Sequence, residues 1–224
     1  GDNFVPPKIR ENFERIKSEN PTFMCEIFTD EDCKRFLHKH YNDDVVDAYE
    51  SLIPGAFKAD LMRYCILYIK GGIYFDAKMK PVNGFLLEDV LDKEYFTRDF
   101  KDSGDGISNA FIVCKPENEK LRKAISLIVQ NVKMRNYGNS SLEPTGPMLL
   151  RSLFTEKEIN DIDFFLTVKP NSPDPKEPIL IISREKENWE SAILEKDVEL
   201  VEEQNAHRKE KNYGILWEER SIYK

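Results

Sequence analysis

The sequence lacks the features that mark several protein classes. No apolar run approaches the roughly 20 residues that a membrane-spanning helix needs, so we expect no membrane span in this chain. An excess of basic residues is also missing, because 41 acidic side chains outnumber 33 basic ones and the formal net charge is -8. Nucleic-acid phosphates require a basic footprint on the protein, so we expect no nucleic-acid partner. A local basic pocket for a phosphorylated small molecule remains compatible with this acidic total.

Cysteine and histidine are scarce. The 4 cysteines form no C-x-x-C pair, and the 3 histidines do not stand at zinc-ligand spacing from them. Cys65 and Cys114 lie inside apolar runs, which predicts buried thiols. Free thiols favour a reducing compartment, so we expect the cytoplasm, with a Golgi-type lumen as the alternative if an N-terminal anchor was removed.

Hydrophobic residues make up 40% of the chain and aromatic residues 11%, which is enough apolar area to offset chain entropy. Segments with helical and with strand periodicity alternate, and neither a linker nor an internal repeat interrupts them. This pattern predicts a single α/β domain over residues 1–224, with a mixed, mostly parallel central sheet flanked by helices. We expect strands at 22–29, 71–79, 94–99, 108–115, 163–170 and 178–183, and helices at 6–21, 30–41, 44–52, 58–70, 117–136 and from 145. Residues 189–212 are charged and predicted to be helical or irregular.

The segment KADLMRYCILYIK, residues 58–70, is apolar on almost every face and therefore predicts a central, buried helix. Asp60 and Arg63 lie three residues apart on it, so their side chains share a face. The simpler interpretation is a plain ion pair between them. Because charged residues are rarely buried unless they are paired or used, a polar functional site at this face is the other interpretation.

The twin glycines Gly71 and Gly72 end this helix and lead into the strand IYFDAK. Alternation along the strand places Tyr74, Asp76 and Lys78 on one face, and apolar side chains on the other. An acid and a base at the carboxyl end of a strand are typical of ligand sites in α/β sheets. The simpler interpretation is a local Asp76–Lys78 contact, which contributes little stability when exposed.

The stretch PGAFKADLMRYCILYIKGGIYFDAKMKPVNGF resembles the core signature of glycosyltransferase family 32, the DXD-motif sugar-binding domains related to the yeast initiating α-1,6-mannosyltransferase. Three later stretches also resemble family elements, namely SNAFIVCKPENEKL, LEPTGPMLL and NYGILW. Together these motifs extend from about residue 20 to near the end of the chain. In this order they are specific, whereas two glycines followed by an aspartate alone would be a weak signal.

The resemblance implies a GT-A (Rossmann-like) fold and transfer of a sugar from a nucleotide-diphosphate donor, with retention of the anomeric configuration. UDP-sugars are favoured as donors by family frequency only, and a glycan, protein or lipid could be the acceptor. The resemblance implies a front-face mechanism, in which the leaving diphosphate takes the acceptor's proton. It also implies the residues that would bind the donor: Asp60, Arg63, Gly72, Tyr74, Asp76, Asn109, Thr145, Gly146, Pro147, Asn212, Tyr213 and Trp217.

The chain departs from the family pattern at the second aspartate of the DXD element, which is Lys78. The histidine that often completes the family's metal site aligns with Asn212, and His207 is out of register. The family's opening strand is not recognisable before residue 6, so either a piece of the native chain is absent or residues 2–5 are its remnant. Asp76 alone is a poor site for a hard divalent cation.

A lysine ammonium offers a compact positive charge without demanding coordination geometry. We therefore expect Lys78, with Asp76 and Arg63, to be catalytic, and Lys80 or Arg63 to assist Lys78. No metal cofactor is then required, and Mn²⁺ or Mg²⁺ on Asp76 is the alternative. A catalytically inactive sugar-nucleotide-binding or scaffolding module is the alternative function.

The other candidates also have simpler structural interpretations. Asn109 would be a turn residue that begins a strand, and Thr145 would be the N-cap of the following helix. Tyr213 and Trp217 stand four residues apart, which is typical of core packing on a last helix.

Overall fold

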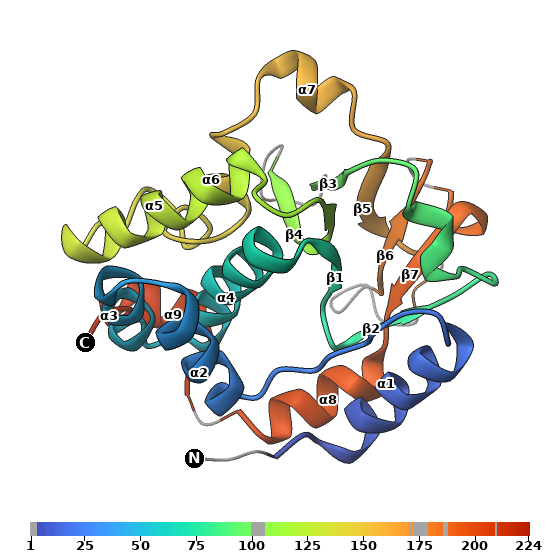
Figure 1. Ribbon diagram of the computed structural model, residues 1–224, viewed down its shortest axis with the longest axis horizontal. Helices are drawn as coiled ribbons and strands as arrows, with labels where there is room; N and C mark the ends of the chain where they lie inside the picture. The colour runs from blue at the N-terminus through green and yellow to red at the C-terminus, as the bar shows by residue number, and fades with distance from the viewer. Residues whose placement is uncertain (1–3, 100–105, 171, 173–178, 186–187, 209) are drawn as a thin grey trace.

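The computed structural model describes residues 4–99, 106–170, 172, 179–185, 188–208 and 210–224. Its described part is built around one seven-stranded sheet with the strand order β1-β4-β3-β5-β6-β7-β2 (Figure 1). The strands are β1 (Gly72–Phe75), β2 (Met79–Pro81), β3 (Tyr95–Asp99), β4 (Ile107–Cys114), β5 (Phe164–Val168), β6 (Leu180–Ser183) and β7 (Ala192–Lys196).

The helices differ in length and in their place along the chain (Figure 1). The α-helices are α1 (Pro7–Glu19), α2 (Asp30–His40), α3 (Asp43–Ser51), α4 (Gly55–Lys70), α5 (Glu119–Lys133), α6 (Pro147–Arg151), α7 (Glu156–Asn160), α8 (Val198–Ala206) and α9 (Tyr213–Glu218). Two 3₁₀ turns, η1 (Leu87–Val90) and η2 (Trp189–Ser191), complete the described elements.

Helix α4 is the central helix that its composition predicts. Its buried residues point in nearly every direction, and they include Phe57, Asp60, Leu61, Met62, Arg63, Tyr64, Cys65 and Leu67. Gly71 ends the helix with φ 64°, a left-handed conformation that L side chains rarely adopt. A Cβ on Gly71 would lie 2.6 Å from Cδ of Pro116, so the close approach to the 114–116 backbone also requires glycine.

Two hydrophobic cores lie on the two faces of the sheet. Helices α2 to α5 and α9 gather on one face and bury Ile112 and Cys114 of β4, and Figure 1 shows these helices together at the left. Phe111 and Val113 point to the opposite face, where they pack with residues of β5, β6, β7 and η1 and with Ile16 of α1. The alternation along β4 therefore follows the period of two that a strand imposes.

The expected α/β class with a mixed sheet is confirmed, but the expectation of a mostly parallel sheet is wrong. Only the β3–β5 pair is parallel among the described strands, and the other five neighbouring pairs are antiparallel. Strand β4 lies between β1 and β3 and runs against both, so these two parallel strands are not neighbours. Strands β5, β6 and β7 follow one another as an antiparallel meander, which needs no crossover helix.

Three further local predictions differ from the structure. Residues 24–29, predicted as a strand, form an irregular connection between α1 and α2. There Phe23 and Cys25 pack against one hydrophobic core and Phe28 against the other, so apolar alternation in this segment serves burial without strand pairing. Strand β2 pairs with β7, and β7 occupies part of the segment predicted as helical or irregular. Both strands are short, which leaves little periodicity to detect.

The prediction of buried thiols is confirmed, and a side-chain cap begins α2. Thr29 and Asp32 form a capping box at the start of α2. Cys65 and Cys114 are buried, and no cysteine is in a disulfide. Burial raises the pKa of the Cys114 thiol to about 12. None of the helices in the described ranges combines the length and apolarity needed to cross a bilayer.

Candidate active site

Three elements bring three charged side chains and one amide side chain together at one edge of the sheet. Helix α4 contributes Asp60 and Arg63, the end of β1 contributes Asp76, and the start of β4 contributes Asn109. Strands β1 and β4 are antiparallel, so the carboxyl end of β1 meets the amino end of β4. The amide nitrogen of Asp76 donates to the carbonyl of Ala110 at 3.0 Å, which fixes the two chain segments against each other.

Arg63 is the centre of this cluster. Its side chain is only 7% exposed, and Nη1 donates to Oδ1 of Asp76 at 3.1 Å and to the carbonyl of Asn109 at 2.5 Å. Nη2 lies 3.3 Å from Oδ1 of Asp60. The guanidinium also lies 4.7 Å from the centroid of the Tyr74 ring. The ion pair predicted from the helix spacing is therefore present, but it belongs to a larger buried network.

Asp60 has partners on both carboxylate oxygens. Nδ2 of Asn109 donates to Oδ1 at 2.9 Å, and Oγ1 of Thr145 donates to Oδ2 at 2.8 Å. Burial raises the pKa of Asp60, while Arg63 and the two hydrogen-bond donors oppose that shift. Thr145 was predicted to cap the following helix, but the N-cap of α6 is Gly146. The hydroxyl of Thr145 instead donates its hydrogen bond to Asp60.

The backbone leaves little space beside Asp60. A Cβ on Gly146 would lie 3.1 Å from the carbonyl oxygen of Leu142 and 3.6 Å from Oδ2 of Asp60. Pro147 follows as the first residue of α6. The predicted segment Thr145–Pro147 therefore lies against Asp60 of α4. Gly146 permits this close approach because it has no side chain.

Asn109 holds a buried acceptor that has no partner. It is 5% exposed, and within the described residues its Oδ1 is the buried side-chain atom without a hydrogen bond. The pairing of β3 with β4 is irregular around it, because Thr97 opposes Ser108 whereas Tyr95 opposes Val113. Such bulges redirect side chains, and here the bulge brings Asn109 to Asp60.

Asp76 lies between two cations. Its Oδ1 accepts hydrogen bonds from Arg63 and from the hydroxyl of Tyr74, the latter at 2.8 Å, and its Oδ2 lies 3.4 Å from Nζ of Lys78. Burial alone would raise the pKa of Asp76, but the charges of Lys78 and Arg63 outweigh it and the pKa is lowered. The carboxylate is therefore ionised at neutral pH.

Lys78 is the most accessible member of the cluster. Its side chain is 33% exposed, against 17% for Asp76. Lys80, expected as a possible assistant, instead pairs with Asp197 at 2.7 Å and with Glu195 at 3.6 Å. Arg63 and Lys78 therefore supply the positive charge around Asp76.

The described residues of the cluster supply few oxygen ligands for a divalent metal. A hard cation needs several oxygen ligands, and no group of three or more histidine, cysteine or acidic side chains with suitable geometry occurs in the described ranges. Asp76 is the ion-pair partner of Lys78, and both of its oxygens already face cations. The ammonium of Lys78 takes the place that a second aspartate would have in the motif.

Some predicted residues lie elsewhere. Gly72 begins β1 and Asp76 follows its end, so four residues of strand, roughly 13 Å, separate them. Asn212 caps α9 by accepting a hydrogen bond from the amide of Gly214 at 2.8 Å. The indole of Trp217 donates to the carbonyl of Tyr137 at 2.6 Å and packs against the helical core.

Tyr213 is closer to the cluster than Trp217. Its ring lies 5.8 Å from that of Phe57 on α4. Burial raises the pKa of the Tyr213 hydroxyl, and the negative charges of Asp60 and Asp99 raise it further. Tyr213 therefore stands beside the acidic side of the site.

Sequence reasoning missed two residues at this edge. Asp99 ends β3, is 7% exposed, and donates its backbone N–H to the carbonyl of Gly106 at 2.8 Å. A Cβ on Gly106 would contact both Asp99 and Pro147. Tyr64 is fully buried, with its hydroxyl 3.4 Å from the carbonyl of Thr145. An acid at the end of the 94–99 strand was the available signal for Asp99, since ligands gather at carboxyl ends of strands.

Comparison with known proteins gives one family and several relatives. Residues 6–97 match the family described as "Glycosyltransferase sugar-binding region containing DXD motif". An uncharacterized glycosyltransferase of Acanthamoeba polyphaga mimivirus is 27% identical over 164 residues, which is 72% of this chain and 63% of that protein. The initiation-specific alpha-1,6-mannosyltransferase of Candida albicans is 31% identical over 85 residues, 35% of this chain and 22% of that protein.

A solved structure shares the fold. PaToxG glycosyltransferase superposes with a TM-score of 0.51 at 16% identity, covering 72% of this chain and 69% of that one. The chain spans less than two thirds of the length of the two curated relatives. The family match includes α4, β1 and the Asp60–Arg63–Asp76–Lys78 cluster. Residues 6–97 are therefore similar to the glycosyltransferase sugar-binding region that contains the DXD motif, and this matched range includes Asp76 and Lys78.

Proposed function

We propose that this protein transfers a sugar from a nucleotide-diphosphate donor, preferably a UDP-sugar, to a glycan, protein or lipid acceptor. The observation that carries the proposal is the ionised Asp76 at the end of β1, held by Arg63 and flanked by the accessible ammonium of Lys78. The glycosyltransferase family match over residues 6–97 supports it. Retention of the anomeric configuration is part of the proposal and follows from the family resemblance.

In the proposed reaction, the bond between the anomeric carbon and the diphosphate oxygen breaks, and its electron pair leaves with the diphosphate. The acceptor hydroxyl oxygen forms the new bond on the same face of the sugar, and its proton goes to the diphosphate. Negative charge that develops on the leaving group must be offset for the bond to break. The ammonium of Lys78 supplies that charge, so catalysis needs no metal ion.

The other members of the cluster have different roles in this proposal. Asp76 and Asp60 contact the donor, because their side chains retain 17% and 12% exposure. Arg63 is a positioning residue, since its guanidinium is 7% exposed and joins both carboxylates. Asn109 positions Asp60, because its Nδ2 donates to Oδ1 of that carboxylate.

A donor panel tests the proposal. The purified chain is incubated with UDP-glucose, UDP-galactose, UDP-N-acetylglucosamine and GDP-mannose, each with EDTA and with Mn²⁺, and nucleotide release is measured. GDP-mannose is included because one relative is named as a mannosyltransferase. We expect release from at least one donor in EDTA, at a rate that Mn²⁺ does not increase. Release that requires Mn²⁺ would refute metal-free catalysis, and no release under either condition, with methyl glycosides of mannose, glucose and galactose added as acceptors, would refute the transferase.

One observation favours a non-catalytic binding module as the second candidate. The side chains of Asp60 and Arg63 already satisfy each other, together with Asn109, Thr145 and Asp76, before any ligand is bound. A binding module would be thermally stabilised by UDP or GDP without releasing nucleotide from any donor. Thermal shift measurements in the same panel therefore separate the two functions.

A further inference from the structure

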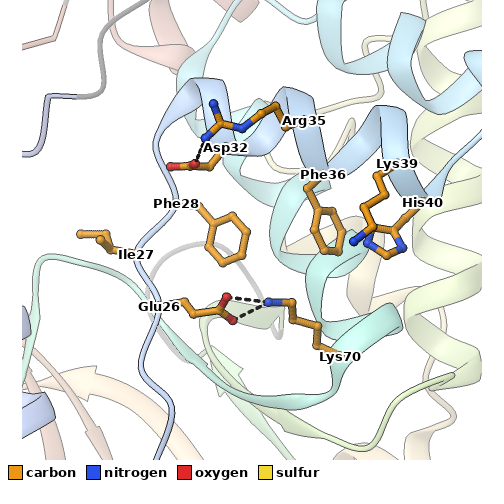
Figure 2. A pocket seen from close by; sticks show the side chains of 9 residues that line it. All are labelled: Glu26, Ile27, Phe28, Asp32, Arg35, Phe36, Lys39, His40 and Lys70. Carbon is orange, nitrogen blue, oxygen red and sulfur yellow. Dashed lines mark hydrogen bonds and ion pairs between the residues drawn. The ribbon is translucent and has the colours of Figure 1, made fainter.

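A pocket of about 390 Å³ lies between residues 26–28, helix α2 and the end of α4 (Figure 2). This volume falls in the range of small-molecule sites. Its lining combines aromatic and charged side chains, chiefly Glu26, Phe28, Asp32, Phe36, Lys39 and Lys70.

The pocket is separate from the candidate active site. Lys70 is the last residue of α4 and precedes the twin glycines, whereas Asp76 follows the far end of β1. The strand between them spans roughly 13 Å, and none of the residues that line the pocket belongs to the Asp60–Arg63–Asp76–Lys78 cluster. A ligand here would therefore leave the donor site open.

Aromatic side chains form the apolar part of the pocket. The ring centroids of Phe28 and Phe36 lie 6.0 Å apart, with an angle of 90° between the ring planes. The ring centroid of His40 lies 4.6 Å from that of Phe36. Figure 2 shows the two phenylalanine rings at the middle of the pocket, with the charged groups around them. An aromatic face carries partial negative charge, so it attracts the weakly positive C–H groups on the apolar face of a sugar ring.

Charged groups beside the rings are arranged as donor–acceptor pairs. Nζ of Lys70 donates to both carboxylate oxygens of Glu26, at 2.7 and 2.5 Å, and lies 5.4 Å from the centroid of Phe28. Arg35 pairs with Asp32 at the other side, as Figure 2 shows. Each pair offers a donor next to an acceptor, which matches neighbouring hydroxyl groups that both donate and accept.

The charge balance disfavours a phosphate ligand. Both acids of the pocket already hold a cation, and a phosphate at Lys70 would meet the carboxylate of Glu26 as a like charge. Lys39 is the lining cation that has no ion-pair partner in the described part of the chain, and one lysine alone is a weak anion site. A neutral, hydroxyl-rich ring avoids this repulsion and uses both kinds of group.

We infer that the Phe28–Lys70 pocket binds a pyranose unit of a glycan, at a site distinct from the donor site. The sugar ring packs against Phe28, which is half-buried, while Phe36 supports that ring from the core, and the sugar hydroxyls bind Glu26 and Lys70. This binding needs neither nucleotide nor turnover, so it stands or falls independently of the proposed transferase activity.

Saturation-transfer NMR and calorimetric titration test this site. The probes are the methyl α-glycosides of mannose, glucose and galactose, offered without nucleotide. We expect saturable binding of at least one glycoside, weakened about tenfold or more by Phe28→Ala and by Lys70→Met, because each removes one of the two recognition elements. Far-UV circular dichroism checks that both variants are folded.

Two controls make the result specific. Lys93 pairs with Asp163 and lies 5.2 Å from the Tyr95 ring, which repeats the environment of Lys70 at a distant place, so Lys93→Met should leave binding unchanged. Asp76→Asn should also retain glycoside binding, which separates this pocket from the donor site.

The inference is overturned if no glycoside binds the wild-type protein, or if binding survives both Phe28→Ala and Lys70→Met. It is overturned as well if inorganic phosphate displaces the glycoside with higher affinity, since the pocket would then be an anion site.

Discussion

The ammonium of Lys78 lies 3.4 Å from Oδ2 of Asp76, on the side opposite to the guanidinium of Arg63 at Oδ1. One carboxylate thus separates a buried cation from an accessible one. The buried cation fixes the orientation of Asp76 because it also bonds to the start of β4. The accessible cation is free to approach a ligand. This division of roles underlies the first four predictions.

Replacing Lys78 by alanine should slow transfer far more than it weakens nucleotide binding. A preorganised donor to a developing negative charge contributes roughly 10²–10³-fold to kcat. We expect a loss of about that size for Lys78→Ala in steady-state kinetics, with UDP affinity changed by less than about tenfold. Lys93→Ala, at an exposed lysine remote from the cluster, is the control. Unchanged turnover in Lys78→Ala would remove Lys78 from the mechanism.

Replacing Lys78 by aspartate should create a metal site. Lys78→Asp exchanges an ammonium for two oxygen ligands next to Asp76, which is the ligand type that hard divalent cations prefer. We expect Mn²⁺ to bind this variant measurably more tightly than the wild-type protein in calorimetric titration, and any transfer activity to become sensitive to EDTA. Equal Mn²⁺ affinity of the two proteins would show that the fold, rather than Lys78, prevents metal binding.

Removing Arg63 should destabilise the fold. Arg63→Ala leaves two buried carboxylates without their shared cation, which costs about 3–5 kcal/mol in comparable buried pairs. Urea unfolding should report a loss of this order. Arg122 forms an exposed i, i+3 pair with Glu119, so Arg122→Ala should change stability by less than about 1 kcal/mol. If Arg63→Ala lowered the free energy of unfolding as little as Arg122→Ala does, the buried ion-pair network around Arg63 would be contradicted.

The stability contributed by Asp76 should disappear in acid. Lys78 and Arg63 lower its folded-state pKa below the unfolded value, in spite of burial. The contribution is therefore complete above the unfolded pKa, about 3.9, and is lost as pH falls through the lower folded pKa. We expect the difference in unfolding free energy between wild type and Asp76→Asn to be constant from pH 7 to about pH 5 and to shrink below about pH 4.

Asp60 provides the opposite comparison for this titration. Burial raises the folded-state pKa of Asp60. The contribution of its protonation to the free energy of unfolding is therefore present below the unfolded pKa and is lost as pH rises through the folded pKa. The difference in unfolding free energy between wild type and Asp60→Asn should therefore decrease as pH rises. If the two variants followed the same pH dependence, the assigned environments of the two acids would be wrong.

The twin glycines should differ in their tolerance of alanine. Both have positive φ, 64° at Gly71 and 104° at Gly72, but a Cβ would clash with Pro116 only at Gly71 and meets open space at Gly72. Backbone strain of this kind costs of order 1–3 kcal/mol. We expect Gly71→Ala to lower the thermal midpoint more than Gly72→Ala. Equal shifts would mean that conformation alone, without the contact to Pro116, requires glycine.

The sequence by itself determined the local features of this protein. The apolar composition of residues 58–70 predicted the central helix α4, and the motif through Asp60, Arg63 and Asp76 indicated the region that matches the family. These features depend on residues close together in the chain, so composition and spacing carry them. The presence of Lys78 in the motif was likewise sufficient to question a metal site.

Only the tertiary structure decided which distant residues meet. It made the sheet mostly antiparallel by placing β4 between β1 and β3, and it turned the apolar 22–29 segment into a connection between two cores. It brought Asn109 and Thr145 onto Asp60, and it left Trp217 bonded to Tyr137 instead of facing the site. Such contacts depend on strand order and helix packing, because residues that stand far apart in the chain become neighbours only when the whole sheet and both cores have formed.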